Sequence, residues 1–155
     1  MYVRPGSFGK RARSGRSYNI SVGDNHLVRV GVQSVTGSSF QLGSNVSGIL
    51  DFSALDESKM TCQQVFITME TEEVIAAKLV VSSRSRQQPQ HEQQNGCAIR
   101  KVQAEFVEYT SDTLHTSFIF TVPMDGPCTF SNNLFSIAWY ICFEFITVAK
   151  GKEQY

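Results

Sequence analysis

The sequence predicts an all-β fold, an antiparallel β-sandwich of about seven strands. Within Leu134–Val148, apolar side chains occupy every second position from Phe135 to Phe145, which is the period of a β-strand. Shorter runs with the same period recur along the chain between turn residues, and no segment shows a convincing helical period. A chain of 155 residues with 41% hydrophobic residues fits one globular domain with one core.

The alternating runs define the expected strands in chain order. These strands are Tyr18–Val22, Leu27–Val35, the run from Phe40 to Phe52, Met60–Thr71, Ala98–Tyr109, Leu114–Val122 and Leu134–Val148. A kink is expected at Glu72-Glu73, and Val74–Val81 after it is either a helical turn or a strand. The all-β context favours the strand. Turns are expected around residues 24–25, 36–39, 51–59 and 123–127.

The segment Leu134–Val148 is apolar enough to raise the alternative of a membrane helix. It is shorter than the roughly 18–20 uninterrupted apolar residues that a span needs, and it contains Glu144. Its β-branched and aromatic residues also favour a strand. We therefore expect one long, central or nearly central strand with an aromatic face that anchors the core.

The charge distribution divides the chain into segments. Five of the 14 basic residues lie in residues 1–16, which hold no acid, so the remaining nine face 14 acids. We expect residues 1–16 to be a disordered basic arm that makes at most weak contact with an anionic membrane. The sandwich is expected at 17–149, a mobile glutamine-rich loop at 82–97 and a tail at 150–155. Because the body is acidic, no nucleic-acid partner is expected.

The sequence offers no constellation that predicts catalysis. Its four cysteines are scattered, with neither CxxC nor HxxxH spacing, so neither a metal site nor a cofactor is expected. The absence of a G-x-S-x-G elbow argues against a triad around His115 and Asp112. The chain is not expected to be an enzyme. Few cysteines and no apolar leader favour a reducing, cytosolic compartment, although Asn19 and Asn45 begin glycosylation tripeptides.

The segment Phe40–Leu50 resembles the strand–turn–strand pattern of arrestin-like domains, which have an immunoglobulin-like sandwich. Gly43 would allow the turn and Gly48 the close approach of a packed neighbour. Leu42 stands where most arrestins have proline. In this respect the sequence resembles one branch of the superfamily, which has the same replacement. That branch is the Rgp-type subunit of the Ric–Rgp complex, a guanine-nucleotide exchange complex for a Golgi Rab GTPase.

Further motifs in the same order extend this resemblance to the C-terminal half of the Rgp-type subunit. They are Tyr18–Ser21, Glu70–Glu73, Leu114–Thr116, Thr121–Pro123, Ile137–Trp139 and Phe143–Thr147. The resemblance implies a signature core made of Leu42, Gly43, Gly48, Trp139, Phe143 and Phe145. Family members carry an additional N-terminal half and a further closing strand, so exchange activity by this chain alone is not expected.

The resemblance implies a non-catalytic subunit, or a fragment of one, that acts as an arrestin-like scaffold in Golgi and endosome trafficking. Its partners would be the large Ric-type subunit and, through the complex, a Rab GTPase. The expected location is cytoplasmic and peripheral on Golgi membranes. Two alternatives stay open: a trafficking adaptor of the arrestin or retromer kind that binds peptides by β-augmentation, and a secreted domain glycosylated at Asn19 and Asn45.

Candidate partner-binding residues come from two kinds of feature. The first is the mixed row of the last strand, Tyr140, Cys142 and Glu144, together with an edge that a missing closing strand would leave open. The second is the set of turns expected around Gly43, Glu72 and Asp125, because sandwiches commonly present contacts on their loops.

Overall fold

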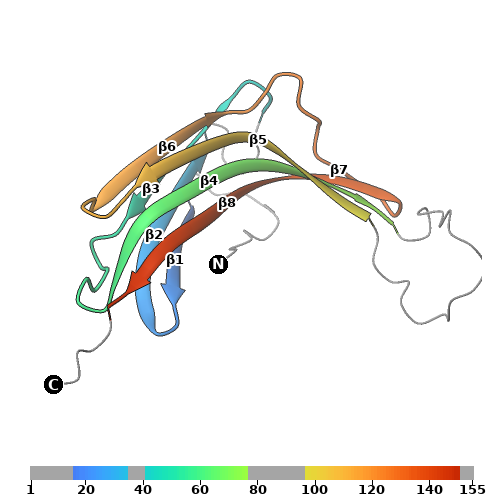
Figure 1. Cartoon of the computed structure of the whole chain (residues 1–155). Helices are drawn as coiled ribbons and strands as arrows, with labels where there is room; N and C mark the ends of the chain where they lie inside the picture. The colour runs from blue at the N-terminus through green and yellow to red at the C-terminus, as the bar shows by residue number, and fades with distance from the viewer. Residues whose placement is uncertain (1–15, 35–40, 77–96, 151–155) are drawn as a thin grey trace, which may run out of the picture.

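The computed structural model describes residues 16–34, 41–76 and 97–150, and these residues form strands, turns and connecting loops with no helix among them (Figure 1). Two four-stranded antiparallel sheets pack face to face, which confirms the predicted β-sandwich. The strands are β1 (Arg16–Val22), β2 (Asn25–Ser34), β3 (Asn45–Asp51), β4 (Met60–Ile75), β5 (Cys97–Tyr109), β6 (His115–Thr121), β7 (Phe130–Ser131) and β8 (Phe135–Ala149).

The first sheet has the strand order β1-β2-β3-β6, and the second has the order β5-β4-β8-β7. In the second sheet, the 16 residues of β4 lie between β5 and β8. Figure 1 shows that this sheet is the longer of the two and that its strands continue past the first sheet toward β7. The chain crosses between the sheets after β3, after β5 and again after β6.

The core lies between the sheets and is built from the inward row of each strand. Val30 and Val46 are fully buried in the first sheet, and Val65, Ile67 and Phe143 are buried in the second. Because alternate side chains of a strand point to opposite faces, these rows account for the period seen in the sequence. Burial of apolar area on this scale is the main favourable term that holds the two sheets together.

One predicted break is wrong. Glu72 and Glu73 do not form a kink, because β4 continues through them to Ile75 and pairs with β5 and β8 along the way. Pairing with a neighbouring strand on each side keeps the backbone of Glu72 and Glu73 extended. The charge of the two side chains is not enough to end a strand. Val74 and Ile75 are therefore strand residues, whereas residues 77–81 of the predicted run lie outside the described residues.

Two strands begin at residues that were expected to belong to neighbouring segments without regular structure. β1 begins at Arg16, which was expected in the basic arm, and β5 begins at Cys97, which was expected in the glutamine-rich loop. The rest of the arm, the rest of that loop and the tail beyond Lys150 lie outside the described residues, as do Val35 and Phe40. Within the described residues, no helix is long and apolar enough to cross a membrane.

Candidate functional site: an open strand edge and a loop cluster

The predicted aromatic strand, β8, is paired fully on one edge and hardly at all on the other. β4 pairs with β8 from Phe135 to Ala149. On the opposite side, β7 pairs only with Ser136 and Ile137. On this second side, no described strand pairs with the stretch Ala138–Ala149, and we call this side of the stretch the open edge.

Two hydrogen bonds show which backbone groups of β8 face β4. The Leu134 carbonyl accepts a hydrogen bond from Ala76 N–H at 2.8 Å, and Lys150 N–H donates to the Lys59 carbonyl at 2.8 Å. Backbone direction alternates along a strand, so the even-numbered residues of β8 face β4. The pairing of the two strands shifts by one residue between Cys62 and Gln64, and the extra residue lies on β4. The alternation of backbone direction along β8 is therefore unbroken.

The odd-numbered residues of β8 direct their N–H and C=O groups to the other side. The Phe135 carbonyl confirms this, because it accepts a hydrogen bond at 3.0 Å from Asn132 N–H next to β7. The odd-numbered residues of the open edge are Trp139, Ile141, Phe143, Phe145, Thr147 and Ala149. Their backbone groups form a row that has the geometry to receive a further strand.

Four of these side chains, Trp139, Ile141, Phe143 and Phe145, face the core, and we call them the inner row. Ile141 and Phe143 are buried, and the Phe143 ring makes an edge contact with Phe118 of β6 at a centroid distance of 5.7 Å. Trp139 and Phe145 pack against the core but stay half-buried. The core therefore comes close to solvent along the open edge.

The even-numbered side chains of the open edge form an outer row that includes the candidates Tyr140, Cys142 and Glu144. Tyr140 is half-buried opposite Glu70 of β4. Cys142 is buried, and burial together with the nearby Glu70 carboxylate raises the pKa of its thiol to about 11. The thiol is therefore protonated at neutral pH and is a poor nucleophile. Glu144 is exposed and forms no ion pair with a described residue.

Apolar side chains lie on the outer face of the second sheet near the outer row. Phe66 of β4 is half-buried between Glu144 of β8 and Val107 of β5. The exposed apolar residues on these strands that accompany it are Val107, Tyr109, Ile146 and Val148. Several apolar groups beside an open edge are typical of a protein contact rather than of a surface that only meets water.

Glu72 lies within β4, so the turn that was predicted around this residue is wrong. It is buried on β4, and its Oε1 atom accepts a hydrogen bond at 2.8 Å from Nε of Arg100 on β5 and forms an ion pair with Nη2 of the same guanidinium, also at 2.8 Å. Arg100 compensates the buried charge from the neighbouring strand. Glu72 therefore joins two strands of the sheet.

The structure brings the other two candidate turns together at one end of the sandwich. Gly43 has a φ of 76°, and its N–H donates to the Val122 carbonyl at 2.7 Å. Val122 N–H donates in return to the Ser44 carbonyl at 2.9 Å. The Met124 side chain lies over Gly43, and the adjacent Asp125 is exposed.

The β6–β7 loop then runs from this cluster to β8. Gly126 packs against the Trp139 ring, where an added Cβ would lie 2.8 Å from Cζ2. The Trp139 indole Nε1–H donates to the Pro127 carbonyl at 2.9 Å. One loop thus connects the Gly43 turn with Trp139 of β8, and no pattern in the sequence predicts this connection.

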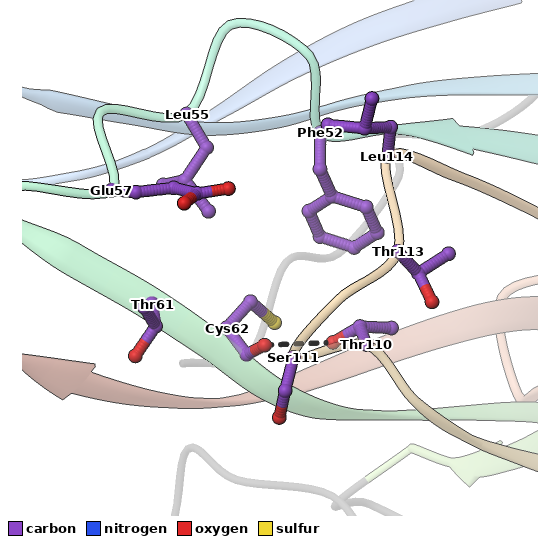
Figure 2. Close-up of a pocket in the computed structure, with 9 residues that line it drawn as sticks. All are labelled: Phe52, Leu55, Glu57, Thr61, Cys62, Thr110, Ser111, Thr113 and Leu114. Atoms are coloured by element: carbon purple, nitrogen blue, oxygen red, sulfur yellow. Dashed lines mark hydrogen bonds between the residues drawn. The ribbon is translucent and has the colours of Figure 1, made fainter.

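At the sandwich end where the β3–β4 and β5–β6 loops meet, Phe52, Leu55, Leu114 and Thr110 surround Cys62 (Figure 2). The cavity measures only about 10 Å³, which is room for about one water. The Thr110 hydroxyl donates to the Cys62 carbonyl at 3.0 Å, and burial raises the pKa of the Cys62 thiol. Among the described residues, no three His, Cys, Asp or Glu side chains are grouped to hold a metal ion. This end of the fold therefore packs loops and has no space for a substrate.

Comparison with known proteins decides the family. The family model described as Rgp1 matches residues 8–148. The chain belongs to the Rgp1 family. This confirms the resemblance to the Rgp-type subunit, and the match includes both the loop cluster and nearly all of the open edge.

Two curated relatives extend the comparison. RAB6A-GEF complex partner protein 2 of Homo sapiens is 29% identical over 140 residues, which cover 87% of this chain and 31% of the human protein. The protein of the same name from Bos taurus gives the same identity and coverage. This Rgp1-family chain therefore spans about a third of the length of these relatives.

Proposed function

We propose that the chain acts as a non-enzymatic subunit, or part of one, in a Rab guanine-nucleotide exchange complex. The observation that carries this proposal is the Rgp1 match over residues 8–148, which contains β1 to β7 and all but the last residue of β8. The relatives are named as partner proteins in a RAB6A-GEF complex. On this proposal, the chain is an arrestin-like scaffold that works at the cytoplasmic surface of Golgi membranes.

The surface of the sandwich supports a binding role. Its distinctive features are the open edge of β8 and the exposed apolar side chains beside it. An unpaired strand edge supplies a row of hydrogen-bonding groups, and apolar neighbours add contact area. We propose the large Ric-type subunit as the direct partner and a Rab GTPase as a partner through the complex.

Co-expression with the large subunit tests this function. The full chain is purified through an affinity tag, and the expected result is stoichiometric recovery of the large subunit. Release of a fluorescent guanine nucleotide from the Rab is then measured with the chain alone and with the assembled pair. The pair should accelerate release and the chain alone should not. If the large subunit does not associate even when the remaining length of the relatives is supplied, the proposal is wrong.

A trafficking adaptor outside any exchange complex is a second candidate, and the open edge is the observation that favours it. Such an adaptor would bind cargo tails as an added strand. Binding of cargo-tail peptides to the purified chain, without any exchange-complex subunit, would favour the adaptor. Binding that requires the large subunit would favour the exchange complex.

We also propose a weak membrane contact through residues 1–16. Each basic residue near an anionic surface contributes about 1 kcal/mol, and the attraction weakens with added salt. Flotation with phosphatidylserine liposomes at low salt should recover more of the full chain than of a chain without residues 1–16. Equal recovery would show that the arm makes no contribution.

A further inference from the structure

The methionines of the described residues differ sharply in exposure. Met60 and Met69 lie in β4 and are 4% and 2% exposed, whereas Met124 in the β6–β7 loop is 76% exposed. Peroxides convert the thioether of methionine into a sulfoxide, and the oxidant must reach the sulfur atom to do so. Among the described methionines, exposure therefore makes Met124 the one that an oxidant in solution can reach.

The sulfur of Met124 also takes part in packing. A Cβ added at Gly43 would collide with Met124 Sδ, so the thioether rests directly on the glycine backbone. Gly43 has a φ of 76°, a conformation that glycine adopts without strain. The turn thus presents bare backbone to the sulfur, and a chemical change at this one atom acts on the turn directly.

Met124 lies between two points at which the β6–β7 loop is held. On one side, Gly43 N–H donates to the Val122 carbonyl at 2.7 Å. On the other side, the Trp139 indole donates to the Pro127 carbonyl at 2.9 Å. Figure 1 shows the loop as the connection from the end of β6 to β7. The contact between Met124 and Gly43 therefore fastens the part of the loop that follows Val122.

We propose that Met124 is a site of reversible oxidation that determines how tightly the β6–β7 loop holds the Gly43 turn. In the forward step, a lone pair of Sδ attacks one oxygen of hydrogen peroxide. An S–O bond forms, the O–O bond breaks, and the second oxygen takes the proton of the first and leaves as water. The sulfur loses the two electrons that the peroxide gains. Reduction by two thiols restores the thioether and yields a disulfide and water.

The sulfoxide changes the contact with Gly43 in two ways. The new oxygen adds volume at an atom that already touches the glycine, and it makes an apolar group polar. A polar S–O group is more favourable in water than against the turn, so the oxidised side chain should leave Gly43. The turn then loses a packing partner, and its hydrogen bonds with Val122 should open more often.

Peroxide treatment followed by peptide mapping tests the site. The full chain is exposed to hydrogen peroxide and digested, and mass spectrometry measures the sulfoxide at each methionine. In the native chain, Met124 should oxidise on the order of tenfold faster than Met60 and Met69. In urea, where burial is lost, the three rates should agree. Equal rates in the native chain, or the same difference in urea, would overturn the proposal.

Amide exchange measured by NMR tests the effect on the loop. The amides of Gly43 and Val122 both donate hydrogen bonds between the turn and the loop, at 2.7 and 2.9 Å. Both should exchange on the order of threefold faster after oxidation. Methionine sulfoxide reductases A and B, supplied together with a dithiol, should restore the slow exchange, because each enzyme reduces one epimer of the sulfoxide.

Met124→Leu is the matched control. It keeps an apolar side chain of similar volume over Gly43 and removes the sulfur. It also keeps the exposed Cys97 and Cys128, so it controls for oxidation of cysteine. Peroxide should leave the Gly43 exchange of this variant unchanged. Met124→Gln places a polar side chain at the same position and should exchange fast at Gly43 without peroxide.

The outcomes are independent of the exchange complex. An oxidised chain with unchanged exchange at Gly43, or a change that is equally large in Met124→Leu, overturns the proposal. Both measurements use the chain without a partner protein. A failure of the proposed function therefore leaves this site standing, and a failure of this site leaves the proposed function standing.

Discussion

Replacing Gly48 by alanine tests the close packing between β3 and β6. An alanine Cβ at this position would lie 2.6 Å from Cζ of Phe118 and 2.7 Å from the carbonyl oxygen of Gly31. Phe118 is 3% exposed and packs against Phe120 and Phe143, so a shift of its ring would disturb these contacts. The backbone oxygen on the other side can move only if β2 shifts. The methyl group therefore fits only if the Phe118 ring or the β2 backbone shifts.

The magnitude follows from these contacts. Overpacking a core typically costs about 1–3 kcal/mol, and contacts on two sides place Gly48→Ala in the upper part of that range. Replacing a strand glycine by alanine offsets about 0.5–1 kcal/mol through the unfolded state. We expect a net loss of about 2 kcal/mol in the free energy of unfolding, or about 6–8 °C in melting temperature for a chain of this size.

Gly31→Ala is the matched control on the adjacent strand. Its added Cβ would meet only the Ile49 carbonyl oxygen at 3.9 Å, an ordinary contact, so stability should stay the same or rise slightly. Urea unfolding followed by circular dichroism measures both variants. Adding Phe118→Leu to Gly48→Ala should cost less than the sum of the single changes, because it removes part of the clash. If Gly48→Ala is as stable as Gly31→Ala, the packing argument is wrong.

Three other predictions follow from single groups. At pH 7.5, iodoacetamide should label the exposed Cys97 and leave the buried Cys142 unmodified in the native chain, as mass spectrometry of digests would show, because the pKa of the Cys142 thiol is about 11. Trp139→Phe should lower the free energy of unfolding by about 1 kcal/mol through the lost hydrogen bond to the β6–β7 loop, and an unchanged urea midpoint would contradict this. Hydrogen bonds from Ser53 lower the pKa of the Asp51 carboxyl below its unfolded value of 3.8. The contribution of Asp51 to the free energy of unfolding is therefore fully present above pH 3.8 and is lost as the pH falls through the lower folded pKa. Asp51→Asn should make the free energy of unfolding depend less on pH over that range.

Much of the strand layout could be predicted from the sequence because burial alternates along each strand. Val28 and Val30 of β2, and Ile141 and Phe143 of β8, are buried at the positions that the period of two indicates. The two residues of β7 are too few to show a period, so the sequence gives no sign of that strand. Alternation therefore predicts long strands and fails for short ones.

The candidate site was predictable only where it depends on one strand. The length and apolar character of β8 are visible in the sequence and predict the strand itself, whereas the open edge was expected only from the family resemblance. The role of Glu72 is not, because its partner Arg100 is 28 residues away on another strand. The Met124 side chain over Gly43 likewise depends on two loops that meet only in the folded chain. Contacts between distant segments carry no local sequence signal.

The geometry of β8 places its two rows of side chains in different surroundings. The odd-numbered residues supply both the core side chains and the backbone groups that face the open edge, so truncating Phe143 would disturb the fold and the contact together. Glu144 lies on the other row, where its side chain is exposed and its own backbone groups face β4. A change at Glu144 should therefore leave the core intact. A strand added beside the half-buried Trp139 and Phe145 would also remove apolar surface from water, so binding at this edge and the stability of the sandwich are thermodynamically linked.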